Sequence, residues 1–133
     1  MRLLVVEDEA LIALTLEDML FNLGCTVVGV AGTAARAMAL AADRSLPIDG
    51  AILDVNLGGE TVYPAAQRLM CRGVPFVFCT GYGKAGIAAE FAHVPTLDKP
   101  YFEDQLRELI IAGLIAPIQH GLASGGLERP CPE

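Results

Sequence analysis

Short apolar runs alternate with helical patterns five times along the chain, and this alternation limits the possible folds more than any other feature. The apolar runs lie at residues 3–6, 26–31, 51–54, 75–80 and 94–99. Each run is followed by a stretch in which apolar residues recur at helical spacing. Nearly continuous apolar strands joined by crossover helices predict an α/β fold, a doubly wound, five-stranded parallel sheet with helices on both faces.

Helices are predicted at residues 9–23, 33–43, 61–71 and 101–114, and within 81–92 a short helix with Ile87, Ala88 and Phe91 is predicted after a glycine-rich turn. Gly24 and Gly73 provide C-terminal stops for the first and third helices, and Thr33 is a candidate N-cap for the second. The fourth helix has the weakest pattern, because it follows a glycine-rich turn and offers few apolar side chains. After the fifth helix, frequent Pro and Gly predict a tail at 116–133 without an output domain, so we expect one folded domain at 1–115.

Composition and charge exclude several classes of protein. The 133 residues are 53% hydrophobic and 19% charged, which is typical of one compact domain and not of a disordered chain. The formal net charge of −7 argues against nucleic acid as a partner, because phosphate backbones bind Lys and Arg. No apolar run is long enough for a membrane helix, and the N-terminus becomes acidic too early for a secretory signal. We therefore expect a cytoplasmic protein without a membrane partner.

The four cysteines are scattered along the chain at Cys25, Cys71, Cys79 and Cys131. They form no CxxC pair and no regular framework, so reduced thiols are expected and metal binding by cysteine is not. Cys79 lies inside an apolar run, where we expect it to act as a small buried hydrophobic residue.

Reactive side chains stand where the predicted strands end. The first strand runs into Glu7 and Asp8, the third ends on Asp54, the fourth on Thr80 and the fifth on Lys99. In a doubly wound sheet, functional residues gather outside the carboxyl ends of the strands. We therefore expect these side chains to converge at one edge of the sheet.

Such a cluster has a definite chemistry. Carboxylates packed together repel one another, and a hard divalent ion such as Mg²⁺ relieves this repulsion while leaving coordination positions for a phosphoryl oxygen. Asp54 would then be a nucleophile towards phosphorus and form an acyl phosphate. Lys99 can pair with Asp54 and later with a phosphoryl oxygen, and the Thr80 hydroxyl can donate to another oxygen.

Each of these residues except Glu7, which precedes the first helix cap, also has a purely structural interpretation. Asp8 can cap the first helix, and Asp54 with Asn56 can form an ordinary turn. Thr80 can be a β-branched strand end, and Lys99 can be a surface lysine ahead of a helix that starts with Pro. The site interpretation is favoured because all of these residues occupy the same relative place in the repeated pattern.

Four segments, LLVVEDE, AILDVNLGG, PFVFCTGYG and LDKPY, carry a resemblance to the receiver domain of two-component response regulators over about residues 2–115. The resemblance implies a flavodoxin-like (βα)5 fold with strand order 2-1-3-4-5. It implies that Glu7 and Asp8 hold Mg²⁺ together with Asp54, the phospho-acceptor. The backbone carbonyl of Asn56 completes the implied metal site.

The resemblance also concerns the residues that respond to phosphorylation. Thr80 matches the hydroxyl that moves towards the phosphoryl group, and Lys99 matches the family's lysine, whose bond to Pro100 is usually cis there. Receivers usually carry Tyr or Phe three residues before this lysine, where this sequence has Thr96. The usual coupling through that aromatic ring is therefore in doubt, and Tyr82 is an alternative moving aromatic residue.

The run FCTGY at 78–82 is similar to the signature Phe-Ala-Thr-Gly-x-Tyr of one receiver subclass, called FATGUY. Members of this subclass often lack the switch aromatic, have a mobile fourth helix and tend to work with HWE-type histidine kinases. The weak pattern at 81–92 fits such a mobile segment, because it buries few apolar side chains.

These features lead us to expect a single-domain response regulator in a phosphorelay. It would receive its phosphoryl group from a histidine kinase, of HWE type by the resemblance, or from a histidine phosphotransfer protein, and would signal to an unidentified downstream protein. It would not be an enzyme, apart from catalysing its own aspartyl phosphorylation and dephosphorylation. A homodimer through the fourth helix, fifth strand and fifth helix is implied by the family.

Two other functions stay open. A pseudo-receiver would be an interaction module that phosphorylation does not regulate. This alternative stays open because position 96 has threonine in place of the usual aromatic residue. An aspartate-nucleophile phosphatase is less favoured, because such enzymes place a second acid two residues after the nucleophile. This sequence has Asn56 there, and Asn cannot act as a general acid.

Overall fold

The computed structural model describes residues 1–116, which form the predicted parallel sheet with two covering layers of helices. In spatial order the strands are β2 (Thr26–Ala31), β1 (Arg2–Val6), β3 (Gly50–Asp54), β6 (Phe76–Thr80) and β7 (Thr96–Asp98). With β6 and β7 as fourth and fifth strands, the predicted order 2-1-3-4-5 is confirmed. The predicted tail lies outside the described residues from position 117 onward, so the domain boundary at 115 stays a prediction.

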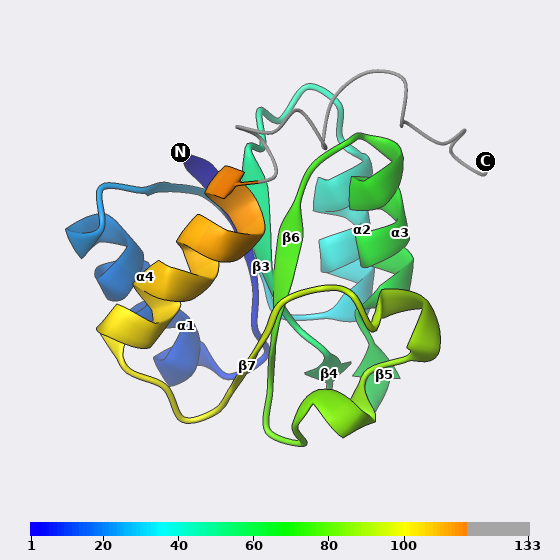
Figure 1. The fold of residues 1–133 in the computed structure, drawn as a ribbon. Coiled ribbons are helices and arrows are strands. Elements are labelled where there is room, and N and C mark those ends of the chain that lie inside the picture. Colours follow the sequence, from blue (N-terminus) through cyan, green and yellow to red (C-terminus); the bar gives the residue numbers. More distant parts are fainter. Residues whose placement is uncertain (117–133) are drawn as a thin grey trace.

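The helices lie on the two faces of the sheet (Figure 1). One face is covered by α1 (Ala10–Asn22) and α4 (Glu103–Ile110), which a π-helical turn at Ile111–Ile115 extends, and the other by α2 (Ala34–Ala42) and α3 (Tyr63–Cys71). The Thr33 hydroxyl accepts a hydrogen bond from the Arg36 amide at 3.1 Å, which confirms the predicted N-cap of α2. None of the helices within residues 1–116 is long and apolar enough to cross a bilayer.

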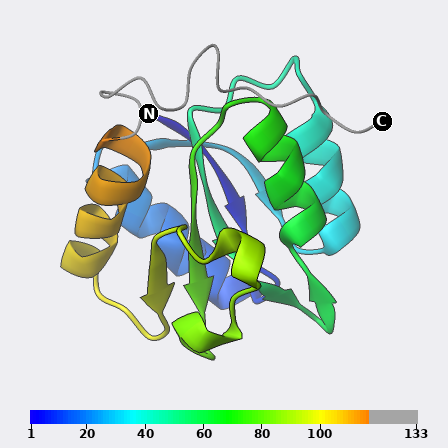
Figure 2. The same ribbon diagram turned by 45° about the vertical axis from the view of Figure 1, so that its right-hand side comes forward.

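The strands of the five-stranded sheet all point towards one edge, which is the lower edge in Figure 2. Met1 and the π-helical turn lie at the opposite, upper edge in Figure 1. The residues that follow the strands are therefore collected at one end of the molecule, as the topology requires.

Two local predictions were wrong. Residues 81–92 form no α-helix but two short 3₁₀ turns, at Lys84–Gly86 and Ala89–Phe91, because the glycines favour turns and Gly83 has a φ of +72°. The third helix begins at Tyr63 and not at residue 61, because residues 56–61 form a hairpin of β4 (Asn56–Leu57) and β5 (Glu60–Thr61). The signal was present in the Gly58-Gly59 turn, whose φ values are +61° and +95°.

Alternation along the strands divides the core into two clusters. Leu53 and Phe78 belong to the cluster beneath α2 and α3, whereas Ile52, Val77 and Cys79 belong to the cluster beneath α1 and α4. Every residue of β3 and β6 is buried, as expected for the central strands of a doubly wound sheet. Because side chains alternate along a strand, Asp54, which lies two positions after Ile52 in β3, projects on the α1–α4 side of the sheet.

The close approach of the π-helical turn to the sheet can be tested at Gly113. A β-carbon at this position would overlap the Val77 side chain, whereas a β-carbon at Gly81 would meet no atom within 4 Å. We expect Gly113→Ala to lower the free energy of unfolding by about 1–3 kcal/mol in urea denaturation, although alanine is the better helix former. Gly81→Ala, the control, should change it much less; an unchanged or increased stability of Gly113→Ala would contradict the observed packing.

Candidate functional site

The predicted site residues do meet at the carboxyl edge of the sheet. Glu7 follows β1, Asp54 ends β3, Thr80 ends β6 and Lys99 follows β7, and these four strands lie side by side. Glu7, Asp54 and Thr80 are buried, although this edge of the sheet faces solvent-exposed loops. Every buried side-chain nitrogen or oxygen in the described part of the chain has a hydrogen-bond partner, so these polar groups are stabilised where they lie.

The Lys99 ammonium lies between two buried carboxylates. Its Nζ donates to Glu7 Oε1 at 2.6 Å and to Asp54 Oδ2 at 3.2 Å. The sequence predicted the contact with Asp54, but not the shorter one with Glu7, which it considered only as a metal ligand. The cluster therefore holds two negative charges and one positive charge when all three groups are ionised.

Burial and charge shift the protonation of this cluster. Burial raises the pKa of Asp54 to about 6, because the Lys99 ammonium offsets only part of the desolvation and the Glu7 charge adds to it. Burial alone would lower the pKa of Lys99, but the hydrogen bond and charge of Glu7 and the charge of Asp54 raise it. Lys99 therefore stays protonated at neutral pH, and Asp54 is a carboxylate whose ionisation is costly without a further cation.

Glu7, Asp8 and Asp54 together could hold a metal ion. Each offers one carboxylate oxygen, and the three oxygens lie within 4.8 Å of one another. Asp8 is exposed, so one side of the cluster is open to solvent. A hard divalent cation prefers oxygen ligands and would counter the excess negative charge, so these donors fit such an ion.

Asn56 lies in the hairpin next to this cluster. Its side-chain oxygen accepts a hydrogen bond from the Gly59 amide at 3.0 Å, and its own amide donates weakly to Asp54 Oδ1 at 3.4 Å. The side chain is thus used within the hairpin, and the ligand role predicted for the backbone carbonyl stays a prediction. This hairpin fixes where the chain runs after the phospho-acceptor candidate Asp54.

Thr80 forms hydrogen bonds with the segment that follows β6 and with the segment that follows β7. Its Oγ1 accepts a hydrogen bond from the Tyr82 amide at 3.0 Å, and its backbone carbonyl accepts one from the Lys99 amide at 2.9 Å. The Lys99–Pro100 peptide bond is cis, as the resemblance implied. The two candidate switch residues differ in environment, because the Tyr82 side chain is exposed whereas the Thr96 hydroxyl donates to the Val94 carbonyl at 3.1 Å.

Cys79 and Tyr101 also lie close to the site, although the sequence analysis assigned neither of them to it. Cys79 is the parallel-sheet partner of Asp54 and is buried, which confirms its predicted burial, and burial raises the pKa of its thiol to about 12. The Tyr101 hydroxyl adjoins that thiol, and burial raises the pKa of Tyr101 as well. The phase of β6 could have placed Cys79 beside Asp54, but no local signal links position 79 to position 101.

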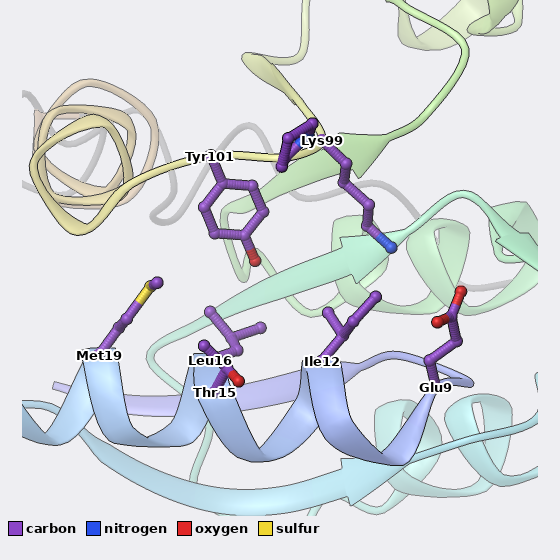
Figure 3. A pocket seen from close by; sticks show the side chains of 8 residues that line it. Glu9, Ile12, Thr15, Leu16, Met19, Lys99 and Tyr101 are labelled. Atoms are coloured by element: carbon purple, nitrogen blue, oxygen red, sulfur yellow. The ribbon is translucent and has the colours of Figure 1, made fainter.

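A groove of about 450 Å³ lies between α1 and the segment at 99–101. Figure 3 shows the side chains that line it. Its lining residues are Glu9, Ile12, Thr15, Leu16, Met19, Lys99, Pro100 and Tyr101. The Tyr101 ring lies over α1, and the Lys99 amine points towards the N-terminal end of that helix. The groove therefore opens beside the cluster at the sheet edge.

Solved structures that are similar to this chain include two of SdrG and one of a PhyR domain, whereas no protein-family model matches the chain. The solution structure of SdrG from Sphingomonas melonis Fr1 is 45% identical with a TM-score of 0.74, covering 84% of this chain and 93% of that one. A BeF3-activated conformation of SdrG, from Pseudomonas melonis Fr1, is 41% identical with a TM-score of 0.65, covering 92% and 96%. The REC domain of the PhyR response regulator from Erythrobacter litoralis is 27% identical with a TM-score of 0.72, covering 84% and 87%.

A curated relative is similar over part of its length. The phyllosphere-induced regulator PhyR of Methylorubrum extorquens is 35% identical over 91 residues, which are 66% of this chain. The match covers 33% of that regulator, so it spans about a third of the longer protein.

The cost of the buried Asp54 carboxylate can be measured without metal. Since folding raises its pKa from 3.8 to about 6, the contribution of Asp54 to the stability of the wild-type protein should fall as pH rises through this range and then level off. In EDTA at pH 7.5, Asp54→Asn should be more stable than wild type by roughly 2–3 kcal/mol in urea denaturation, and the difference should shrink towards pH 4. Exposed Asp18 provides the control, Asp18→Asn, which should show no such trend; a constant difference for Asp54→Asn would contradict the explanation.

Proposed function

Because this chain belongs to the receiver-domain family of response regulators, we propose that it is a switch controlled by phosphorylation of Asp54. One observation carries the proposal: Lys99 Nζ lies 3.2 Å from a buried Asp54 carboxylate, beside the oxygens of Glu7 and Asp8. This arrangement provides a nucleophile, a permanent cation and a set of oxygen ligands at one solvent-facing edge of the sheet.

The chemical step follows from these groups. An Asp54 carboxylate oxygen attacks the phosphorus of a phosphohistidine or a small acyl phosphate, and a new O–P bond forms as the donor's P–N or P–O bond breaks. The electron pair of the broken bond leaves with the donor. Lys99 exchanges its contact with Asp54 for one with a phosphoryl oxygen, and the Thr80 hydroxyl donates to another.

Mg²⁺ is the cation proposed for the three-carboxylate cluster. When bound, it would neutralise the excess charge of the carboxylates and of the incoming phosphoryl group. Asp8 and Asp54 would hold it directly, with the Asn56 carbonyl as the backbone ligand. Glu7 would contribute less, since its Oε1 is shared with Lys99 at 2.6 Å.

We assign the chain to the FATGUY subclass because of the run at 78–82 and the threonine at position 96. The proposed phosphoryl donor is a histidine kinase, of HWE type, or a histidine phosphotransfer protein in the cytoplasm. Support comes from the relative SdrG, which has been solved in a BeF3-activated conformation, since BeF3 is a phosphoryl mimic. The output would be contact with a further protein or a second copy, and no reaction on an external substrate.

The two alternatives make different use of the same residues. A pseudo-receiver would keep the fold but not respond to phosphorylation. Position 96 is threonine and not an aromatic residue, and this is the feature that supports the alternative. A phosphatase would need a general acid near Asp54, but the Asn56 side chain cannot supply a proton to a leaving group and is bonded to the Gly59 amide.

Phosphorylation can be tested with acetyl phosphate and Mg²⁺. We expect wild type to gain one phosphoryl group, detected by phosphate-affinity electrophoresis or intact mass, and Asp54→Asn to gain none because it lacks the nucleophile. Asp18→Asn, which alters an exposed carboxylate on α1, should behave as wild type. Equal labelling of wild type and Asp54→Asn would refute the assignment, and no labelling of either would favour the pseudo-receiver.

The metal site can be tested at Asp8, which is exposed and contributes one of the clustered oxygens. Asp8→Asn should raise the Mg²⁺ concentration needed for half-maximal phosphorylation by on the order of tenfold, because one charged ligand is lost. Its urea stability in EDTA should change little. If the Mg²⁺ dependence of Asp8→Asn matched that of wild type, Asp8 would not be a ligand.

A further inference from the structure

The segment that follows β6 is attached at two points by side-chain hydroxyls. Near its start, the Tyr82 amide donates to Thr80 Oγ1 at 3.0 Å, and further along the Ala88 amide donates to the Tyr63 hydroxyl at 2.9 Å. Thr80 belongs to the candidate site, whereas Tyr63 is the first residue of α3. The two attachments divide residues 81–91 into parts with different support.

Residues 81–86 have little to hold them. They are exposed, apart from the half-buried Gly83, and their 3₁₀ turn at Lys84–Gly86 contains no buried residue. Gly83 and Gly86 reduce the number of side chains that could pack there. A segment with so few buried apolar contacts can rearrange at low cost.

Residues 87–91 are held much more firmly. Ile87 and Ala88 pack against the core beneath α2 and α3, and Phe91 is fully buried. The Phe91 ring stacks on Tyr63, with centroids 5.1 Å apart and planes 16° apart, and meets Phe78 edge to face at 5.7 Å. In Figure 1 the second 3₁₀ turn lies beside the lower end of α3, and the first lies further down, near the bottom of the molecule.

A second hydrogen bond links this firmer part to α3. Gln67 Nε2 donates to Glu90 Oε2 at 3.1 Å, one turn of α3 beyond Tyr63. This bond is exposed and contributes less than the buried ring contacts. Tyr63 therefore supplies both the main apolar contact and the one side-chain acceptor for the backbone at Ala88.

We propose that Tyr63 is a positioning residue that anchors residues 87–91 to α3 and limits a rearrangement starting at Thr80 to residues 81–86. The inference rests on the proposed function, because the rearrangement starts when the Thr80 hydroxyl turns to a phosphoryl group on Asp54. That rotation takes the acceptor away from the Tyr82 amide and frees the first attachment. The second attachment does not depend on Asp54, so the change stops there.

This arrangement gives the chain an aromatic residue with a static role. Tyr63 and its ring partners Phe78 and Phe91 lie on the α2–α3 side of the sheet. Thr96 of β7, in contrast, carries no ring that could move with Thr80. The number of residues that rearrange after Thr80 is then limited by Tyr63, which stays fixed on α3.

Tyr63→Phe removes the hydroxyl and keeps the stacked ring, so it tests the anchor in the unphosphorylated protein. We expect amide hydrogen exchange at Ala88 to become roughly fivefold to tenfold faster, because its acceptor is lost while the fold persists. Tyr82→Phe, which removes the hydroxyl of an exposed ring, should leave exchange at Ala88 unchanged. Unchanged exchange at Ala88 in Tyr63→Phe would overturn the inference.

Beryllofluoride with Mg²⁺ tests the limit on the rearrangement. In wild type, amide chemical shifts should change at residues 81–86 and little at 87–91, whereas in Tyr63→Phe the changes should extend to Phe91. The same extent in both proteins would overturn the inference. If beryllofluoride changed nothing in wild type, the proposed function would fail, and the exchange experiment would still decide whether Tyr63 anchors the backbone.

Discussion

The ammonium of Lys99 between the carboxylates of Glu7 and Asp54 is the interaction on which the rest of the site depends. Two carboxylates at the end of adjacent buried strands would repel each other, and an ammonium at 2.6 and 3.2 Å makes their burial tolerable. One positive charge does not balance two negative ones, and Asp8 adds a third beside them. The site residues are therefore in place, but their charges do not balance. Such an imbalance suits the proposed reaction, in which Lys99 and Asp54 exchange partners.

Most of the fold, and the membership of the site, could be predicted from sequence because both follow from a repeated local pattern. Apolar runs fix the strands, and a parallel sheet brings residues that follow each strand to one edge, however far apart they are in the chain. Asp54 and Lys99 are 45 positions apart, yet each stands at the end of its run, and their contact was expected. The N-cap at Thr33 was similarly readable from neighbouring residues.

The errors concern features that depend on distant residues or on glycine. The segment at 81–92 has helical spacing at Ile87 and Phe91. In the structure Ile87 packs against the core and Phe91 stacks on Tyr63, and the backbone forms 3₁₀ turns that allow this packing. The hairpin at 56–61 has strands of only two residues each, so the Gly58-Gly59 turn was its main sequence signal. The Lys99 bond to Glu7 and the neighbourhood of Cys79 and Tyr101 join segments that no local pattern connects.

Both Met1 and the π-helical turn at 111–115 lie at the sheet edge opposite the carboxylate cluster of Glu7, Asp8 and Asp54. A five-residue strand spans about 15 Å, so a label, a surface tether or a fused module attached to either of these positions would start roughly one strand length from Asp54. Such an attachment would leave the cluster of Glu7, Asp8 and Asp54 accessible to a phosphoryl donor. A module that stayed at that edge would not touch the Asp54 carboxylate, so it would respond to the state of Asp54 through a conformational change in the rest of the domain.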